Sequence, residues 1–297
     1  LAAEGLQIVL CQPGTWESKV HYSMRFANHI AQSNYKIVFV VKEWWMEQTL
    51  LGLHHIPATT ALVAVLANDE AASFELVRRA GMVWNAVVTI SPRIHQKAVA
   101  LLPDLGMEFI PCGIVLPTDA AVCQRRSWEL PLRLLYVGRL DQLKGILLLP
   151  GIVAICRRWE LPVQLTVIGD GPDRELLTDA ITEQHVADLI DLRGPQLSDA
   201  VYAAMQTHHV LLMPTCSEGG LSFVLIEAQA NGCVPIASRL AGSTDVAVED
   251  GVSGHLVAVG DPVAFAQAVA RLLDAGRWQA MSRAGIERAR HLFSSAA

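Results

Sequence analysis

Short apolar runs rich in β-branched residues alternate with helical patterns along nearly the whole of this chain of 297 residues. The alternation predicts an α/β fold built on doubly wound parallel sheets. In the first part we expect strands at 6–10, 36–41, 61–66, 86–90 and 108–110, with helices at 69–80 and 92–102. In the second part we expect strands at 132–137, 164–168, 189–192, 210–213, 234–237 and 255–257, with helices between them and from residue 262 onward.

The alternation breaks once, around residues 111–117, and residues 119–130 are polar with no clear strand. We therefore expect a Rossmann-like domain over 1–117, a linker over 118–130 and a second Rossmann-like domain over 131–297. Two such domains in tandem place a cleft between the carboxyl ends of two sheets, where open α/β sheets bind ligands.

Net charge and the length of the apolar stretches argue against a nucleic-acid-binding protein and against a membrane-spanning one. The net charge is −6 and the Lys and Arg residues are scattered, so we expect no nucleic-acid-binding surface. The longest apolar stretch, residues 146–156, is shorter than the ~20 residues that a membrane span needs. The six cysteines form no CxxC pair, which indicates reduced, buried thiols and a cytoplasmic protein.

A glycine turn, a helix start and two carboxylates come together in residues 218–238. Glu218-Gly-Gly follows an apolar, strand-like run, and Glu227 lies in the next helix, which we expect to be amphipathic and to end at Gly232. The first N–H groups of a helix attract phosphate, and carboxylates accept hydrogen bonds from hydroxyl groups. The segment therefore predicts a nucleotide-sugar site, with a glycine-started helix and ordinary surface acids as the alternative.

Two cations follow another apolar strand, in the stretch from Leu135 to Gly145. The strand ends at Gly138, where a ligand can approach the backbone closely, and Arg139 and Lys144 lie in the loop after it. Arg through its planar fork and Lys as a point charge can clamp a diphosphate. The alternative is a solvated loop with two surface charges.

The stretch from Thr166 to Asp173 is a strand followed by a glycine-rich turn into a helix. It lacks the third glycine of the dinucleotide-binding pattern G-x-G-x-x-G, and Asp173 and Glu175 at the following helix start would repel phosphate. We expect a structural turn here.

The order of four motifs resembles that of retaining glycosyltransferases of family 4. These motifs are Val-Gly-Arg139-Leu with Lys144-Gly, Val-Ile-Gly-Asp-Gly-Pro172, Ser217-Glu-Gly with Leu-Ile-Glu227-Ala, and residues 249–257. In the first part, residues 87–91 are similar to a strand of the family that leads into a serine, here Ser91. Residues 109–114 are similar to the family's turn into the linker. The resemblance implies the GT-B architecture, two Rossmann-like domains that face each other across a cleft.

The resemblance also implies roles for individual residues. Arg139 and Lys144 would hold the donor diphosphate, Glu227 the ribose hydroxyl groups, and Arg193-Gly194 would lie where the family's backbone contacts the nucleotide base. Glu218, Arg139 and Lys144 are the expected catalytic residues. The expected donor-binding residues are Gly138, Arg139, Lys144, Arg193, Gly194, Glu218, Gly219, Gly220, Leu221, Ser222, Phe223 and Glu227.

Three departures from the family pattern stand out. Eight residues separate Glu218 from Glu227, where the family has seven, so the extra residue must lie in the glycine loop. The family's glycine-rich acceptor loop is replaced by Pro13-Gly-Thr-Trp-Glu-Ser-Lys19, and the chain ends at Ala297, about where the family continues into a crossing helix. Together with the start at Leu1, these departures suggest a chain trimmed at both ends.

Three functions remain open at this stage. The first is a retaining glycosyltransferase that moves a sugar from a nucleoside-diphosphate sugar to a hydroxyl group of a glycan or lipid-linked saccharide. The second is a nucleotide-sugar-binding module without catalysis, and the third is a sugar-nucleotide epimerase on the same architecture. We expect no cofactor and no metal ion, since no Asp-x-Asp occurs.

Other candidate residues favour structural roles. The pairs His54-His55 and His208-His209 lack the i, i+4 spacing of a helical metal site. Core or interface packing is expected for Trp44-Trp45, with contact at the inner membrane face or with a lipid-linked acceptor as the alternative. The sequence predicts no oligomeric state.

Overall fold

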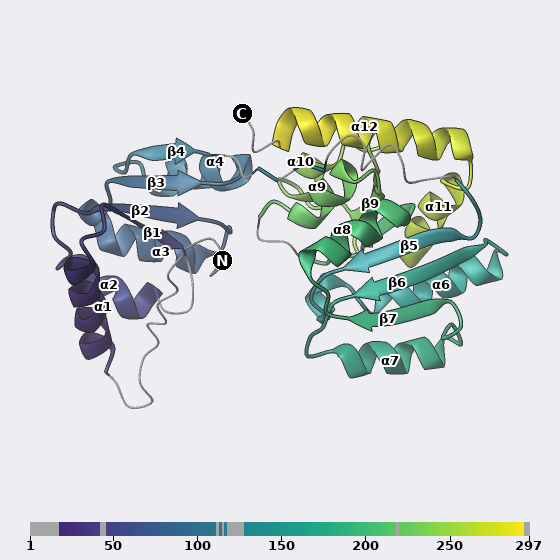
Figure 1. Cartoon of the computed structure of the whole chain (residues 1–297), viewed down its shortest axis with the longest axis horizontal. Helices are drawn as coiled ribbons and strands as arrows, with labels where there is room; N and C mark the ends of the chain where they lie inside the picture. Colours follow the sequence, from purple (N-terminus) through teal and green to yellow (C-terminus); the bar gives the residue numbers. More distant parts are fainter. Residues whose placement is uncertain are drawn as a thin grey trace. The chain divides into compact units, whose positions relative to one another are not determined.

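The computed structural model describes residues 18–41, 46–110, 113–114, 116–117, 128–217 and 220–293. The chain divides into two compact units, Leu1–Ile110 and Pro111–Ala297, each with its own parallel sheet (Figure 1). The expected strand at 6–10 and most of the expected linker lie outside the described residues. The proposed domain limits therefore stay predictions.

Among its described residues, the first unit contains four parallel strands in sequence order, β1-β2-β3-β4. Helix α1 packs against α2, and the hydroxyl of Ser23 in α1 donates to the carbonyl oxygen of Thr49 in α2 at 3.0 Å. The strands are β1 (Ile37–Val41), β2 (Ala61–Leu66), β3 (Ala86–Thr89) and β4 (Met107–Phe109). The helices are α1 (Lys19–Ser33), α2 (Met46–Leu53), α3 (Ala71–Ala80), the 3₁₀ turn η2 (Gly81–Val83) and α4 (Pro92–Leu101).

In the part of the second unit that the structure describes, six parallel strands lie in the order β10-β9-β8-β5-β6-β7. The chain builds outward from β5 to β7, then returns to the other side of β5 and builds outward again from β8. The strands are β5 (Leu132–Val137), β6 (Val163–Ile168), β7 (Ile190–Gly194), β8 (Val210–Met213), β9 (Val234–Ser238) and β10 (His255–Val257). The direction of winding therefore reverses between β5 and β8, which defines the topological switch point of a doubly wound sheet.

Helices cover both faces of this second sheet (Figure 1). They are the 3₁₀ turn η3 (Gln142–Lys144), α6 (Leu148–Arg158), α7 (Arg174–Glu183), α8 (Ser198–Thr207), α9 (Phe223–Ala230), α10 (Thr244–Ala247), α11 (Pro262–Arg271) and α12 (Ala275–Phe293). Coverage of both faces is typical of parallel sheets and explains why every residue of the central strands β8 and β9 is buried.

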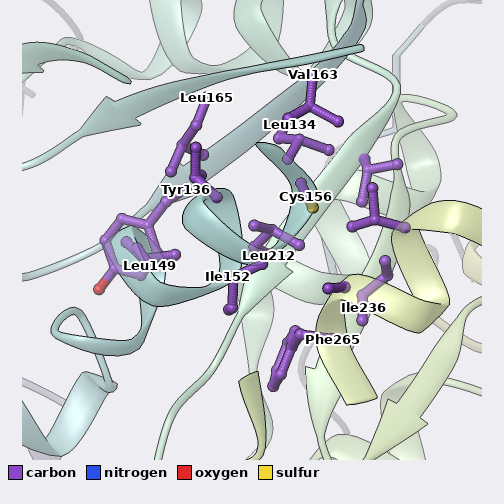
Figure 2. Close-up of a cluster of buried hydrophobic side chains, with 14 of the residues drawn as sticks. Leu134, Tyr136, Leu149, Ile152, Cys156, Val163, Leu165, Leu212, Ile236 and Phe265 are labelled. Carbon is purple, nitrogen blue, oxygen red and sulfur yellow. The ribbon is translucent and has the colours of Figure 1, made fainter. Parts of the chain in front are cut away.

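Two hydrophobic clusters form the core, one on each face of the second sheet. Successive residues of β5 point to opposite faces, so that Leu134 and Tyr136 join one cluster and Leu135 the other. Figure 2 shows the first cluster, in which side chains of four strands meet Ile152 of α6 and Phe265 of α11. Both of these side chains are fully buried. This packing fixes the strand ends at which the loops of the switch point begin.

The expected fold class is confirmed, and β2, β5, β8 and β10 begin and end at the expected residues. The expected amphipathic character of the helix after Gly220 is wrong. Helix α9 packs against the sheet, α8, α10 and α12, and five of its eight residues are buried. Its sequence is apolar on nearly all sides, which is typical of a helix buried in a core.

The expected burial of the cysteines holds for only some of those that the structure describes. Cys156 and Cys233 are buried free thiols, and burial raises the pKa of the Cys156 thiol to about 12. Cys216 is exposed, because it lies in the loop after β8 rather than within a strand or helix. Among the helices of the described residues, none is both long and apolar enough to cross a membrane.

The N-terminus of α11 offers a test of how the helices of the second unit are stabilised. The Asp261 carboxylate accepts a hydrogen bond from the backbone N–H of Ala264 at 2.9 Å, and Pro262 occupies the first helical position. We expect Asp261→Ala to lower the free energy of unfolding by about 1 kcal/mol, because it removes an N-cap. Urea denaturation measures this loss. Asp179→Ala on the exposed side of α7 is the matched control and should stay within about 0.5 kcal/mol of wild type; equal losses would contradict the capping role.

Candidate functional site

A pocket of about 360 Å³ lies in the second unit where β5 and β8 end and α9 begins. This position is the switch point of the sheet, where doubly wound folds bind their ligands. The lining residues come from β5 and the loop after it, from the end of β8, and from the start of α9. They are Tyr136, Val137, Gly138, Lys144, Met213, Thr215, Leu221, Ser222, Phe223, Val224 and Glu227. We call this the candidate donor pocket.

Backbone contacts hold two walls of this pocket together. Gly145 has a φ of +69°, and a Cβ at this position would lie 1.8 Å from the carbonyl oxygen of Pro214. The carbonyl oxygen of Leu143 accepts hydrogen bonds from the backbone N–H of Cys216 at 2.8 Å and from the hydroxyl of Thr215 at 3.1 Å. The turn η3 is therefore fixed against the loop after β8, and this contact places Lys144 in the pocket wall.

The glycine-rich turn after β6 braces the loop after β5. A Cβ at Gly169 would lie 1.8 Å from the carbonyl oxygen of Gly138, and one at Gly171 would lie 2.3 Å from that of Leu140. The Asp173 carboxylate accepts a hydrogen bond from the backbone N–H of Gln142 at 2.9 Å. Since its glycines are needed for backbone packing and its acid binds a neighbouring loop, the turn has the structural role that the sequence predicts.

The N-terminus of α9 faces the pocket without a capping side chain. Ser222 occupies the N-cap position, but its hydroxyl donates to the sulfur of Met213 at 3.2 Å and makes no cap hydrogen bond. Phe223 and Val224, the first two residues of the helix, line the pocket. The first N–H groups of a helix have no intrahelical acceptor and carry the positive end of its dipole, so that this end of α9 can bind an anion.

The two cations after β5 differ in their surroundings. Lys144 is half-buried and lines the pocket, and its backbone N–H donates to the Asp141 carboxylate at 3.0 Å. The side chain of Arg139 is 67% exposed, and its Nε lies 3.2 Å from the second oxygen of the same carboxylate. Arg139 does not line the pocket. The structure therefore places one of the two expected clamp residues in the pocket and pairs the other with an acid beside it.

Glu227 brings a carboxylate into the same pocket from the second turn of α9. It is the one charged residue of that helix. The hydroxyl of Tyr202 in α8 donates to its Oε1 at 3.1 Å. Burial raises the pKa of Glu227, and this hydrogen bond opposes part of the rise. The arrangement combines an acceptor for hydroxyl groups with a cation and a helix N-terminus in one cavity.

The remaining expected site residues fall into two groups. Arg193 and Gly194 do not line the pocket: the Arg193 guanidinium binds Asp191 at 2.7 Å, and the Gly194 carbonyl oxygen accepts from the backbone N–H of Gly169 at 3.0 Å. Glu218 and Gly219 lie outside the described residues. Gly220 is described, and its carbonyl oxygen accepts a hydrogen bond from the hydroxyl of Ser243.

Several lining residues have no counterpart among those expected from the sequence. Tyr136, Val137, Met213 and Thr215 lie at or just beyond the ends of β5 and β8. Since ligands of parallel sheets bind at the carboxyl ends of the strands, counting the last residues of each expected strand and the two residues after it as site residues would have found them. No sequence signal pointed to Tyr202.

The histidine pair His208-His209, between α8 and β8, has the structural role that the sequence favours. His208 is buried, and its Nε2 lies 2.9 Å from the hydroxyl oxygen of Thr166. The Nδ1 of His209 accepts a hydrogen bond from the backbone N–H of Arg133 at 2.9 Å. Trp44 and Trp45 lie outside the described residues, so their role stays a prediction.

The match to a known protein family lies within the second unit of the chain. Residues 131–275 match the family model described as "Glycosyl transferases group 1". A curated relative from Salinispora tropica, named D-inositol 3-phosphate glycosyltransferase, is 32% identical over 185 residues. The match covers 58% of this chain and 38% of the relative, so the chain spans well under half of that protein's length.

Two solved structures are similar over nearly the whole chain. A variant of S. aureus TarM in complex with fondaparinux, α-GlcNAc-glycerol and UDP has a TM-score of 0.80 and 11% identity, and the match covers 94% of this chain and 57% of TarM. Anabaena HepE in complex with UDP-glucose has a TM-score of 0.76 and 14% identity, with 92% and 78% covered. These likenesses show the fold.

The chain has the GT-B fold, two α/β units with parallel sheets. The match to the glycosyl transferases group 1 model lies over the unit that contains the candidate donor pocket. The fold and this match together support a GT-B glycosyltransferase, as the sequence motifs predict.

Proposed function

We propose that this chain is the part of a retaining glycosyltransferase that binds a nucleoside-diphosphate sugar and transfers its sugar to a hydroxyl group. The observation that carries the proposal is the meeting of three features in one pocket. The uncapped N-terminus of α9, the half-buried Lys144 and the partly buried Glu227 all line it. A nucleoside diphosphate needs positive charge for its phosphates and acceptors for its ribose, which these groups supply.

The expected chemistry follows from charge. When the bond from the sugar to the diphosphate breaks, negative charge develops on the departing phosphate. Lys144 and the first N–H groups of α9 lie where they can stabilise that charge, and such preorganised groups commonly contribute about 10²–10³ in rate. Arg139 would join them by giving up its ion pair with Asp141, in which the arginine side chain is 67% exposed and the contact is therefore weak.

Glu227 would bind the ribose hydroxyl groups, and the loop that contains Glu218 and Gly219 would meet the sugar. We assign no covalent nucleophile. In the proposed mechanism the acceptor hydroxyl attacks on the face that the diphosphate leaves, and the departing phosphate takes its proton. The configuration at the sugar carbon is then retained.

The donor and acceptor classes rest on similarity. The similar structures of TarM and HepE contain UDP or UDP-glucose, and the TarM structure also contains α-GlcNAc-glycerol. We propose a nucleoside-diphosphate sugar as donor, a glycan or lipid-linked saccharide as acceptor, and no metal ion, because Lys144 and α9 supply the positive charge. Arg193-Gly194 would lie near the nucleotide base.

A thermal-shift panel tests the proposal. At a concentration of ten times Kd, a nucleoside diphosphate should stabilise the folded protein by about 1.4 kcal/mol. We therefore expect ADP, GDP or UDP, or its sugar conjugate, to raise Tm by about 3–6 °C. The matching nucleoside, which lacks phosphates, should raise Tm less at the same concentration. A protein whose Tm responds equally to nucleoside and nucleoside diphosphate would contradict the phosphate site, and one that responds to neither would contradict the proposal as a whole.

A further inference from the structure

We propose that Tyr202 is a positioning residue for the donor, which holds the Glu227 carboxylate in place for the ribose of the nucleotide sugar. This inference rests on the proposed function. Tyr202 lies in α8 and Glu227 in α9, 25 residues further along the chain, and the tyrosine hydroxyl donates to Oε1 of the glutamate at 3.1 Å. Helix α8 thus contributes a residue to the support of the site, although all the sequence motifs of the site lie on other elements.

The surroundings of Tyr202 fix the direction of its hydroxyl. The phenol ring packs against the hydrophobic cluster formed by α8, α9 and the sheet. A second link joins the same two helices, because Asn231 accepts from the side-chain amide of Gln206 at 2.7 Å and donates to the Glu227 carbonyl oxygen at 2.9 Å. Since the ring and both helices are held, the tyrosine hydroxyl is a fixed donor rather than a mobile surface group.

Tyr202 acts through Glu227 and not on the ligand. It does not line the candidate donor pocket; it lines a separate pocket of about 380 Å³ together with Asp199, Gln206 and Asn231. Its hydrogen bond occupies Oε1 of Glu227. A carboxylate can accept about four hydrogen bonds, so the other oxygen stays available for ribose hydroxyl groups.

The protonation states agree with these roles. Burial, followed by the charge of Glu227, raises the pKa of Tyr202, so the phenol keeps its proton at neutral pH and remains a donor. Burial raises the pKa of Glu227, and the Tyr202 hydrogen bond lowers it. The tyrosine therefore favours the ionised carboxylate, which is the form that accepts hydrogen bonds from ribose.

Few other charged groups of the described residues approach Glu227. Lys144 of η3 lines the same pocket, and Asp199 of α8 acts on Tyr202. Helix α12 packs against α9 through small residues such as Gly285, while its Arg288 binds Glu249 and carbonyl groups of α10. The β8 and β9 strands contribute no charged residue. Tyr202 is thus the group whose loss should change the titration of Glu227 most directly.

The test compares wild type with Tyr202→Phe, which keeps the ring packing and removes the hydroxyl. The probe is whichever of ADP, GDP and UDP raises Tm most, and calorimetry measures its Kd from pH 5 to pH 8. We expect Kd at neutral pH to rise about two- to tenfold, the range for loss of one hydrogen bond. Removing the donor also raises the pKa of Glu227 further, so the fall in affinity on acidification should begin at a higher pH in the variant.

The matched control is Gln206→Ala, which removes the other link between α8 and α9 and leaves the Glu227 carboxylate untouched. Its pH profile should follow that of wild type. In a Glu227→Gln background, Tyr202→Phe should no longer move the profile. A ¹³C NMR titration of the Glu227 carboxyl in ligand-free wild type and Tyr202→Phe gives the same comparison without a ligand.

The outcomes separate the positioning role from the proposed function. Wild-type affinity and an unchanged profile in Tyr202→Phe would overturn the positioning role, as would weaker binding with an unmoved profile, which indicates a purely structural effect. A wild-type protein that binds no nucleoside diphosphate at any pH would overturn the proposed function, and this inference with it.

Discussion

Replacement of Lys144 by methionine should weaken the binding of a nucleoside diphosphate by about 1.5–3 kcal/mol, the range for a hydrogen bond to a charged group. Lys144 is half-buried and lines the pocket that the N-terminus of α9 faces. Methionine keeps much of the length of the side chain and removes its charge. The nucleoside, which lacks phosphates, should bind almost as it does to wild type, and calorimetry with both ligands measures the difference.

Two other cations serve as comparisons. Arg139 is exposed and paired with Asp141, so Arg139→Met should cost less than Lys144→Met. Lys36 is an exposed residue of the first unit, and Lys36→Met should leave both affinities unchanged. The assignment of Lys144 to the phosphates would be wrong if Lys144→Met weakened nucleoside and nucleoside diphosphate by the same amount.

Replacement of Glu227 by alanine should weaken nucleoside and nucleoside diphosphate alike, by about 1–3 kcal/mol. The proposed partner of this carboxylate is the ribose, which both ligands share. Because burial raises the pKa of Glu227 and only its ionised form accepts hydrogen bonds, affinity should fall as the pH is lowered, and the fall should begin at a higher pH than for an exposed glutamate. Calorimetry from pH 5 to pH 8 measures both effects.

Two further variants serve as comparisons for Glu227→Ala. Glu183→Ala removes an exposed acid of α7 and should change neither affinity nor pH profile. Glu218, which lies outside the described residues, is predicted to contact the sugar, so Glu218→Ala should spare the nucleoside diphosphate and weaken its sugar conjugate. Loss of nucleoside diphosphate affinity in Glu218→Ala, with full affinity in Glu227→Ala, would reverse the two assignments.

Local sequence patterns predicted the parts of this fold that depend on local chemistry. The strands β5 and β8 begin and end where expected, because each is a short apolar run bounded by polar, glycine or proline residues. Lys144 was predicted as a site residue from one motif and Ser222 and Glu227 from another, and the structure brings the two motifs into one pocket. The parallel arrangement of the strands explains this convergence, since their carboxyl ends lie at one edge of the sheet.

Features that depend on contacts between distant elements could not be predicted in this way. The burial of α9 results from its position between the sheet and α12, which no local pattern specifies. The hydrogen bond from Tyr202 to Glu227 depends on how α8 packs against α9. The ion pair of Arg139 with Asp141 is close in sequence, but a sequence gives no side-chain direction in a loop.

A crystal structure of the complex with the nucleoside diphosphate that stabilises the protein most tests the central claim directly. The phosphates should lie between the Lys144 ammonium group and the first N–H groups of α9, with the ribose hydroxyl groups against Glu227. Phosphates bound elsewhere in the second unit, or a ribose that does not contact Glu227, would contradict the account.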